Sequence, residues 1–408
     1  MLLPKLAFRN VLRQKRRSIL TAMSMTGGYI LFSFFVSLLD GSYGNLIELF
    51  TRDHTGHIQI HFGNYLDRPK LFKSIKRRSE LEAALSEEEA VQAFAPRVFA
   101  PALAYAKEKS TPVTVVGIDP AMEKNTSMLF HKVKEGNYFS DDVNADGFYP
   151  AMLGLGVADS LKLNVGDEIV LISQGADGSI ANDIYLVSAK VGTKSSNERQ
   201  SVYLPMFAAQ EFLTMGGGVH EYAILLNHSD EAIDVADALR SRMQNSDWVL
   251  SPWQKVEETF YKTMQADQQA AYVELGIVIF LVCIGVLNTV VMSVLERTRE
   301  FGVLRAIGTN PGKIISMVIM ETSILALFSC ILGFIISVPI NTWFTYVGFV
   351  LPEPVDIGGI MASHMQGVLT FKVFALPTLV VVASAITVSI PPSIRAARIT
   401  PAEALASH

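Results

Sequence analysis

Hydrophobic residues are concentrated in long runs along the chain, and the length of these runs predicts helices that cross a membrane. A hydrocarbon core about 30 Å thick is crossed by about 20 residues of α-helix. Runs of this length lie at 19–39, 275–295, 314–338 and 371–390. Glycines inside them, such as Gly28, Gly285 and Gly333, are typical of spanning helices that pack closely. The pattern predicts a membrane α-helical fold with four transmembrane helices.

The basic residues between these runs orient the predicted helices. Lys and Arg are frequent in residues 1–18 and 296–313 and recur in 391–408, whereas 339–370 contains neither. Because basic loops stay on the cytoplasmic side, both termini and 296–313 are predicted to be cytoplasmic. A cleaved signal peptide fits the first run poorly, because the run is long and no A-x-A site ends it. We therefore expect a multi-pass protein of the bacterial inner (cytoplasmic) membrane.

The segment 40–274 is predicted to be a large α+β extracytoplasmic domain inserted between the first two spans. Short apolar runs alternate with turn signals, and strands are expected at 113–118 and 168–173, helices at 80–85 and 231–243, and a β-rich lobe at about 115–205. The pair Gly166–Asp167 predicts a tight turn after an apolar stretch at 161–165. Residues 253–272 are polar and helix-prone, so they are expected to extend the second span outward as one rod.

Composition supports a membrane protein with an ordinarily folded outer domain. Half of the 408 residues are hydrophobic and 18% are charged, against about 25% charged in soluble domains. The net charge of −5 argues against a nucleic-acid-binding protein. Cys283 and Cys330 both lie inside apolar runs. The outer domain therefore has no disulfide framework and must rely on a packed core.

A histidine-containing run at 53–61 is the one candidate for a metal site. Its alternation predicts a strand with His57, Gln59 and His61 on one face and Ile58 and Ile60 on the other. His57 and His61 would then lie about 13 Å apart, too far to bind one zinc ion at about 2 Å. A half-buried structural strand is the better interpretation.

One amide and one carboxylate side chain lie inside predicted spans. Asn288 lies in the second run, and Glu321 lies about two turns inside the third. Carboxylates within a bilayer are costly and face a partner group or the interior of the bundle. Glu321 is interpreted either as a packing hydrogen bond or as part of a gate.

The segment 296–313 begins with charged residues and then becomes apolar. As a short helix, it would place Phe301, Leu304 and Ile307 against a surface while Arg297, Glu300 and Arg305 pair outward. That surface is either a protein partner or lipid headgroups. Residues 308–313 (GTNPGK) are one residue short of a phosphate-binding loop. No other nucleotide or catalytic motif is found, so a nucleotide site is expected in another chain.

These residues resemble a known family. Asn288 to Gly308 (NTVVMSVLERTREFGVLRAIG) is similar to the coupling segment of ABC transporter permeases of the FtsX/MacB/LolC-LolE superfamily, the mechanotransmission type. Supporting segments with the same order as in that family are LAFRN near the N-terminus, MET at 320–322, PPSIRAARITPAEAL at 391–405, and VGID, EGNYF and LNVGDEIV in the outer domain. The GHIQI run at 56–60 resembles the first strand of lipoprotein-releasing members. Residues 1–18 resemble the family's amphipathic N-terminal helix.

The resemblance implies a dimer of permeases, identical or different, each bound to a cytoplasmic ABC ATPase subunit. The implied ATPase-coupling residues are Glu296, Arg297, Arg299, Glu300, Leu304, Arg305 and Ile307. The chain itself is expected to hold no cofactor and no catalytic site, because ATP and Mg would be bound by the partner ATPase. Implied further partners are a lipoprotein or lipid-like substrate and a periplasmic carrier or adaptor protein.

Three functions are compatible with these features. The first is release or export of a lipoprotein or another hydrophobic substrate, driven by the partner ATPase. The alternative is an FtsX-type transmembrane signal transmitter that activates an envelope hydrolase, although such members usually have a smaller outer domain. A sensor or anchored enzyme that works without an ATPase is the third, and no catalytic constellation supports it.

Overall fold

The computed structural model describes residues 15–139, 143, 147–243, 247–357 and 360–399. The chain divides into two compact units. The helical unit contains the chain up to Asn45, Met264–Glu353 and the chain from Ser363, and the outer unit contains Leu46–Thr263 and Pro354–Ala362. Most of the helix predicted at 1–18 lies outside the described residues, and Lys15 already begins the first long helix.

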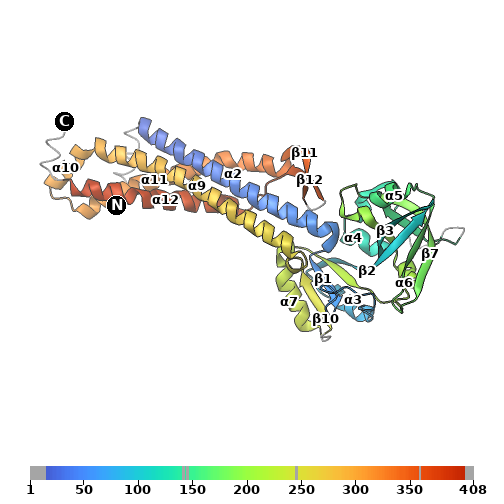
Figure 1. The fold of residues 1–408 in the computed structure, drawn as a ribbon. Coiled ribbons are helices and arrows are strands. Elements are labelled where there is room, and N and C mark those ends of the chain that lie inside the picture. The colour runs from blue at the N-terminus through green and yellow to red at the C-terminus, as the bar shows by residue number, and fades with distance from the viewer. Residues whose placement is uncertain (1–14, 140–142, 144–146, 244–246, 358–359, 400–408) are drawn as a thin grey trace. The chain divides into compact units, whose positions relative to one another are not determined.

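The helical unit is built from long helices that lie side by side (Figure 1). They are α2 (Lys15–Phe50), α9 (Glu258–Glu296), α11 (Pro311–Tyr346) and α12 (Phe371–Arg398). Each is long and apolar enough to cross a membrane, and each contains one predicted span. The predicted tail 391–408 begins as part of α12, and 400–408 lie outside the described residues. The described part of this unit also contains the short helix α10 (Thr298–Ala306). The hairpin of β11 (Phe349–Ile357) and β12 (Ile360–Met365) is divided between the two units.

Small residues bring these helices into close contact. A Cβ atom on Gly333 of α11 would lie 2.6 Å from the ring of Tyr29 on α2, and one on Gly285 of α9 would lie 2.7 Å from Ser24 Oγ. The Tyr29 hydroxyl also donates a hydrogen bond to the Phe374 carbonyl of α12 at 3.1 Å. The close packing expected from glycine in spanning helices is therefore present.

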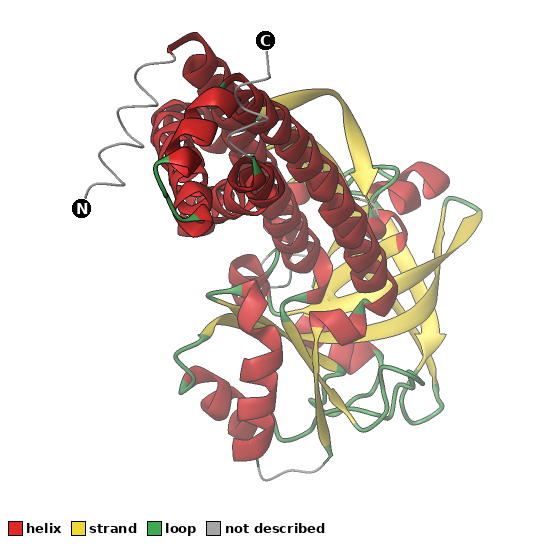
Figure 2. Ribbon diagram, turned by 90° about the vertical axis from the view of Figure 1, so that its left-hand side faces the viewer, coloured by secondary structure: helices red, strands yellow, loops and turns green. Residues whose placement is uncertain are grey.

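The outer unit is an α/β domain around one large sheet, seen as yellow arrows in Figure 2. Its strands are β1 (Ile58–Phe62), β2 (Val91–Ala106), β3 (Lys109–Ile118), β4 (Val133–Gly136), β5 (Pro150–Gly154), β6 (Glu168–Gln174), β7 (Ile180–Val191), β8 (Ser201–Pro205), β9 (Glu221–Leu226) and β10 (Trp248–Pro252). Its helices are α3 (Arg78–Ser86), α4 (Pro120–Thr126), α5 (Leu155–Leu161), α6 (Met206–Phe212), α7 (Ala232–Arg242) and α8 (Trp253–Val256). Shorter turns are η1 (Thr51–Thr55), η2 (Leu129–Lys132), η3 (Asn197–Gln200) and η4 (Ser229–Glu231).

The strand order places β1 inside the sheet. The order is β10-β1-β9-β2-β3-β8-β5-β7-β4, and β6 pairs with both β2 and β7. The strands predicted at 113–118 and 168–173 lie in β3 and β6, and the helices predicted at 80–85 and 231–243 correspond to α3 and α7. Gly166 does form a turn, with φ +94. The apolar stretch before that turn consists of the end of α5 at Leu161 and a short loop.

The second span extends far beyond a bilayer. Helix α9 has 39 residues and is therefore about 58 Å long at about 1.5 Å per residue. The prediction of one rod from residue 253 is wrong in one detail. Trp253–Val256 form the separate helix α8, and Glu257, with φ −112 and ψ 55, interrupts the helical path before α9 begins.

Candidate functional site

The segment 296–313 forms a short helix between two sharp turns. Helix α9 ends at Glu296, and Arg297 is the N-cap residue of α10. After α10, Gly308 has φ +88, a backbone conformation that favours glycine. Asn310 then caps α11, since its Oδ1 accepts a hydrogen bond from the Gly312 N–H at 2.9 Å, and Pro311 occupies the first turn of α11.

Arg297 points inward and forms the centre of a buried ionic contact. Its Nη1 lies 2.8 Å from Glu321 Oε2, and its Nε lies 2.8 Å from Glu300 Oε2. The guanidinium also lies 5.2 Å from the centre of the Phe301 ring. Arg297 is 5% exposed and Glu321 is 7% exposed. Glu321 is thus neutralised by the first residue after α9, and this contact connects α11 to the α9–α10 turn.

This arrangement corrects the predicted orientation of α10. Arg297 does not pair outward, and Phe301 does not reach an outer surface. Phe301 is 1% exposed and belongs to the apolar core of the helices, beside residues such as Ile314 and Ala397. The physical reason is that a carboxylate inside the bundle requires a counter-charge, and Arg297 is the cation that the turn places beside Glu321. Leu304 is partly buried against the same core.

The exposed face of α10 carries a different set of side chains. Glu296, Arg299, Glu300 and Ile307 are exposed, and Ile307 is 74% exposed. Arg305 is half-buried and donates a hydrogen bond to the Thr309 carbonyl at 3.3 Å, so it holds the end of α10. Val303, 53% exposed, was missed by the sequence analysis. Its position four residues after Arg299 and four before Ile307 was the signal that could have identified it.

The other polar residue predicted inside a span lies on the surface of the helical unit. Asn288 of α9 is exposed, between the exposed apolar side chains of Ile284, Leu287 and Met292. An amide side chain on a lipid-facing surface is unfavourable unless another polar group meets it. Asn288 therefore marks a surface of α9 that is suited to a second helix.

The histidine-containing strand is a structural element of the outer unit. His57 Nδ1 accepts a hydrogen bond from the Leu226 N–H at 2.9 Å, and His61 Nε2 lies 3.3 Å from Glu221 Oε2. Both faces of β1 are buried, with Ile58 and Ile60 fully buried and both histidines 1% exposed. The expected half-buried strand is therefore wrong, because β1 lies inside the sheet between β10 and β9. Burial lowers the pKa of His57.

One face of the outer sheet exposes a patch of apolar side chains, which we call the apolar sheet face. It consists of Leu103 and Tyr105 on β2, Ile172 on β6, and Ile180 and Ile184 on β7, each at least 36% exposed. The register brings them together, since Leu103 pairs with Ile172, and Val170 of β6 pairs with both Tyr105 and Ile184. On a domain that is surrounded by water, an exposed apolar cluster of this kind is typical of a surface that contacts another molecule.

Four apolar helices, an α/β domain between the first two, and a short helix between the second and third define a multi-span membrane protein with one large inserted domain. Two family models match the chain. The MacB-like periplasmic core domain matches residues 18–242, and the FtsX-like permease C-terminal model matches residues 272–401. The chain belongs to this family of FtsX-like permeases with a MacB-like periplasmic core domain, and the four apolar helices together with the permease relatives imply an inner-membrane protein.

Characterised relatives agree with this assignment. The chain is 27% identical over 315 residues to the lipoprotein-releasing system transmembrane protein LolC of Xylella fastidiosa (strain Temecula1 / ATCC 700964), covering 73% of this chain and 74% of that one. It is 22% identical over 351 residues to LolE of Haemophilus influenzae, covering 82% of each. It is also 22% identical to the macrolide export ATP-binding/permease protein MacB of Acinetobacter baylyi, covering 79% of this chain and 49% of that one.

Among solved structures, half of this chain is similar to the periplasmic region of MacB from Actinobacillus actinomycetemcomitans. The sequences are 16% identical, the TM-score is 0.37, and the match covers 50% of this chain and 91% of that chain.

Proposed function

We propose that this chain is the permease subunit of an ABC complex in which a separate ATPase, binding ATP and Mg²⁺, drives movement of the extracytoplasmic domain. The observation that supports this most is the construction of α10. Its inner side is anchored by Arg297 and Phe301, while its outer side exposes Arg299, Val303 and Ile307. A helix held firmly on one side and exposed on the other is suited to receive a force from a docked protein.

The orientation required by this function has both termini and α10 in the cytoplasm of a bacterial inner-membrane protein. Its support is the distribution of basic residues, since Lys and Arg flank α10 and are missing from residues 339–370. An ATPase would then meet α10 from the cytoplasm, and the domain between α2 and α9 would lie outside.

The proposed cargo is a lipoprotein or another lipid-like molecule, which the complex releases or exports. Relatives named as parts of lipoprotein-releasing systems support this choice. An acyl chain requires an enclosing pocket, so the exposed apolar sheet face suits a docked protein better. We assign this face to a periplasmic carrier that accepts the cargo.

The permease acts in a pair with a second permease. Asn288 supports this arrangement because a polar side chain among exposed apolar ones on α9 gains a hydrogen bond when a second helix covers it. The partner of α9 is either a second copy of this chain or a related permease.

The docking assignment is tested by Val303→Asp and Arg299→Glu on the exposed side of α10. Both variants should fold normally but lose co-purification with the partner ATPase and lose stimulation of its ATPase rate. Arg77→Glu is the matched control, because the Arg77 side chain is 72% exposed on the outer domain. Normal binding and stimulation by both α10 variants would contradict the proposal.

A further inference from the structure

Helix α2 ends inside the outer unit and continues directly into a buried turn. The π-helical turn η1 follows directly after Phe50, and its residues Thr51, Asp53 and Thr55 are buried. Gly56 then reverses the chain into β1 with φ +69, and a Cβ atom there would lie 2.9 Å from the Ile224 carbonyl. A displacement of the end of α2 is therefore passed directly to η1.

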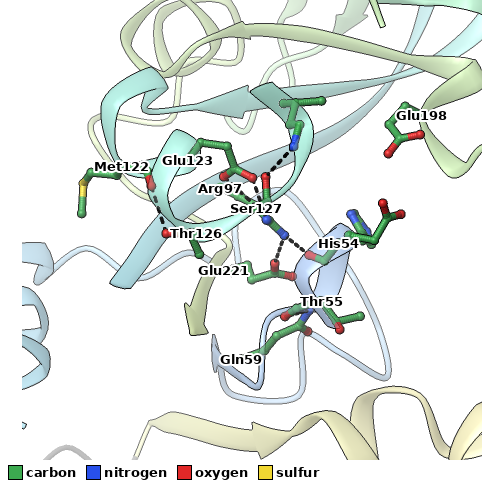
Figure 3. Close-up of polar contacts among 12 residues, drawn as sticks. His54, Thr55, Gln59, Arg97, Met122, Glu123, Thr126, Ser127, Glu198 and Glu221 are labelled. Atoms are coloured by element: carbon green, nitrogen blue, oxygen red, sulfur yellow. Dashed lines mark hydrogen bonds and ion pairs between the residues drawn. The ribbon is translucent and has the colours of Figure 1, made fainter. Parts of the chain in front are cut away.

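The first contact of η1 is with the central part of the sheet, through Arg97 of β2. Arg97 forms a forked pair with Glu123 of α4, at 2.7 and 3.1 Å, and contacts Glu221 of β9 at 3.2 Å. Its Nη1 also donates a hydrogen bond to the His54 carbonyl of η1. Figure 3 shows Arg97 between these three groups. Because a guanidinium fork fixes direction as well as distance, Arg97 is a rigid anchor.

The second contact of η1 is with the side of the domain that contains β4, β5, β7, η2 and η3, which we call the β-rich part. This contact is made through Lys132 at the end of η2. The Lys132 ammonium contacts Asp53 of η1 and Glu198 of η3. Both carboxylates are buried, at 9% and 5% exposure. Burial raises the pKa of Asp53, and Lys132 opposes that effect. The Met128 N–H, just before η2, also donates a hydrogen bond to the Arg52 carbonyl at 3.0 Å.

The chemistry of the two contacts differs. Lysine interacts as a compact charge on a flexible stem, so its ion pairs persist through small changes of angle. Two buried carboxylates around one ammonium are also costly, and apolar groups of similar size would often stabilise a fold at least as well. The Asp53–Lys132–Glu198 contact is therefore suited to connect two parts of the domain while tolerating small changes of angle between them.

We propose that Lys132 joins the end of α2 to the β-rich part of the outer domain, so that this part follows α2 while Arg97 holds the central sheet. This inference deepens the proposed function and rests on it for the source of the movement. Lys132 is a positioning residue in this scheme, since it acts through Asp53 and Glu198.

The test uses the full-length triple variant Asp53→Asn/Lys132→Met/Glu198→Gln. It replaces all three charged side chains of the contact by uncharged ones, so that no buried charge is left without a partner. Spin labels are placed at Leu49→Cys on α2 and Ser160→Cys on α5, after replacement of Cys283 and Cys330. A reference pair joins Leu49→Cys to Ser79→Cys on α3. Distances are measured by electron paramagnetic resonance in lipid nanodiscs, with the chain alone and with its ATPase and ATP.

We expect a narrow distribution of distances between labels 49 and 160 when Asp53, Lys132 and Glu198 are unchanged. In the triple variant this distribution should be broader or shifted. The 49–79 distances and the thermal unfolding temperature should stay unchanged, and ATP-dependent displacement of residue 160 should fall by about fivefold or more. The matched control Lys190→Met removes another ion pair of this region, with Glu135, and should keep the narrow distribution.

An unchanged distribution of the distances between labels 49 and 160 in the triple variant would overturn the proposal that Lys132 joins these two parts. Equal broadening of both label pairs, or a large loss of thermal stability, would also overturn it, since the cluster would then only support the fold. If the ATPase neither binds nor moves the unmodified chain, the proposed function fails, while the distances in the chain alone still decide whether Lys132 joins these two parts.

Discussion

Arg297 and Glu321 are linked by a buried ion pair in which Nη1 lies 2.8 Å from Oε2. The pair connects the turn after α9 to a carboxylate inside α11, and it accounts for the carboxylate that the sequence places inside the third span. Removing one member leaves a buried charge without a partner, whereas replacing both by apolar groups leaves none.

We therefore expect Arg297→Met to destabilise the helical unit by about 3–5 kcal/mol, and Arg297→Met/Glu321→Leu to recover most of that loss. Thermal unfolding of the full chain in detergent measures both. Arg299→Met is the control, because Arg299 is exposed and two residues away. Equal stability of the single and double variants would show that the pair does not act as a unit.

The sequence was sufficient to predict the four spans and the main strands and helices of the outer domain, because each has its own apolar periodicity. It failed where two segments distant in the chain decide a side chain's direction. Arg297 was placed outward because its periodicity on α10 is that of a surface residue, and only the packing of α11 brings Glu321 beside it. His57 and His61 were placed on a half-exposed face because no pattern within β1 reveals that other elements cover both sides.

The apolar sheet face makes a prediction about cargo transfer. Leu103→Asp and Ile172→Asp should leave the outer domain folded, since both side chains are exposed, yet prevent a carrier from docking. Lipoproteins should then accumulate in the inner-membrane fraction of cells that depend on this permease, as shown by membrane fractionation. Ile233→Asp on α7 is the control, being 46% exposed away from this face. Normal lipoprotein distribution in both sheet-face variants would contradict the assignment.

Buried histidines give the outer domain a predicted sensitivity to acid. His220 Nδ1 accepts a hydrogen bond from the Phe99 N–H at 2.9 Å, and its Nε2 contacts the Leu71 carbonyl at 3.0 Å. His57 Nδ1 accepts one from the Leu226 N–H. Protonation of either Nδ1 would break a bond to the backbone. Burial lowers the pKa of both His57 and His220 from the ordinary value of 6.5.

Because the folded-state pKa is lowered, the unfolded chain binds these protons first as the pH falls. The stability that the neutral rings provide is complete above pH 6.5, the unfolded value, and is lost progressively below it. Each histidine should contribute at most about 1.4 kcal/mol per pH unit. Thermal unfolding of the full chain from about pH 7.5 to about pH 5.5 measures the loss. His220→Gln should reduce the slope, and the exposed His131→Gln should not; equal slopes in all three proteins would contradict this account.

The last prediction concerns Asn288 and the permease pair. Leu281, Ile284, Asn288, Val291 and Leu295 follow one another at spacings of three and four along α9, the pattern of a helix-pairing seam with one polar position. Asn288→Leu should weaken association of the permeases by about 0.6–2 kcal/mol, the range measured for hydrogen bonds between spanning helices. Energy transfer between labelled chains in lipid bilayers measures the association. Met292→Leu, which keeps an exposed apolar side chain, should leave it unchanged. Equal association of Asn288→Leu and unmodified chains would place the permease contact on another surface, because the amide would then gain nothing from pairing.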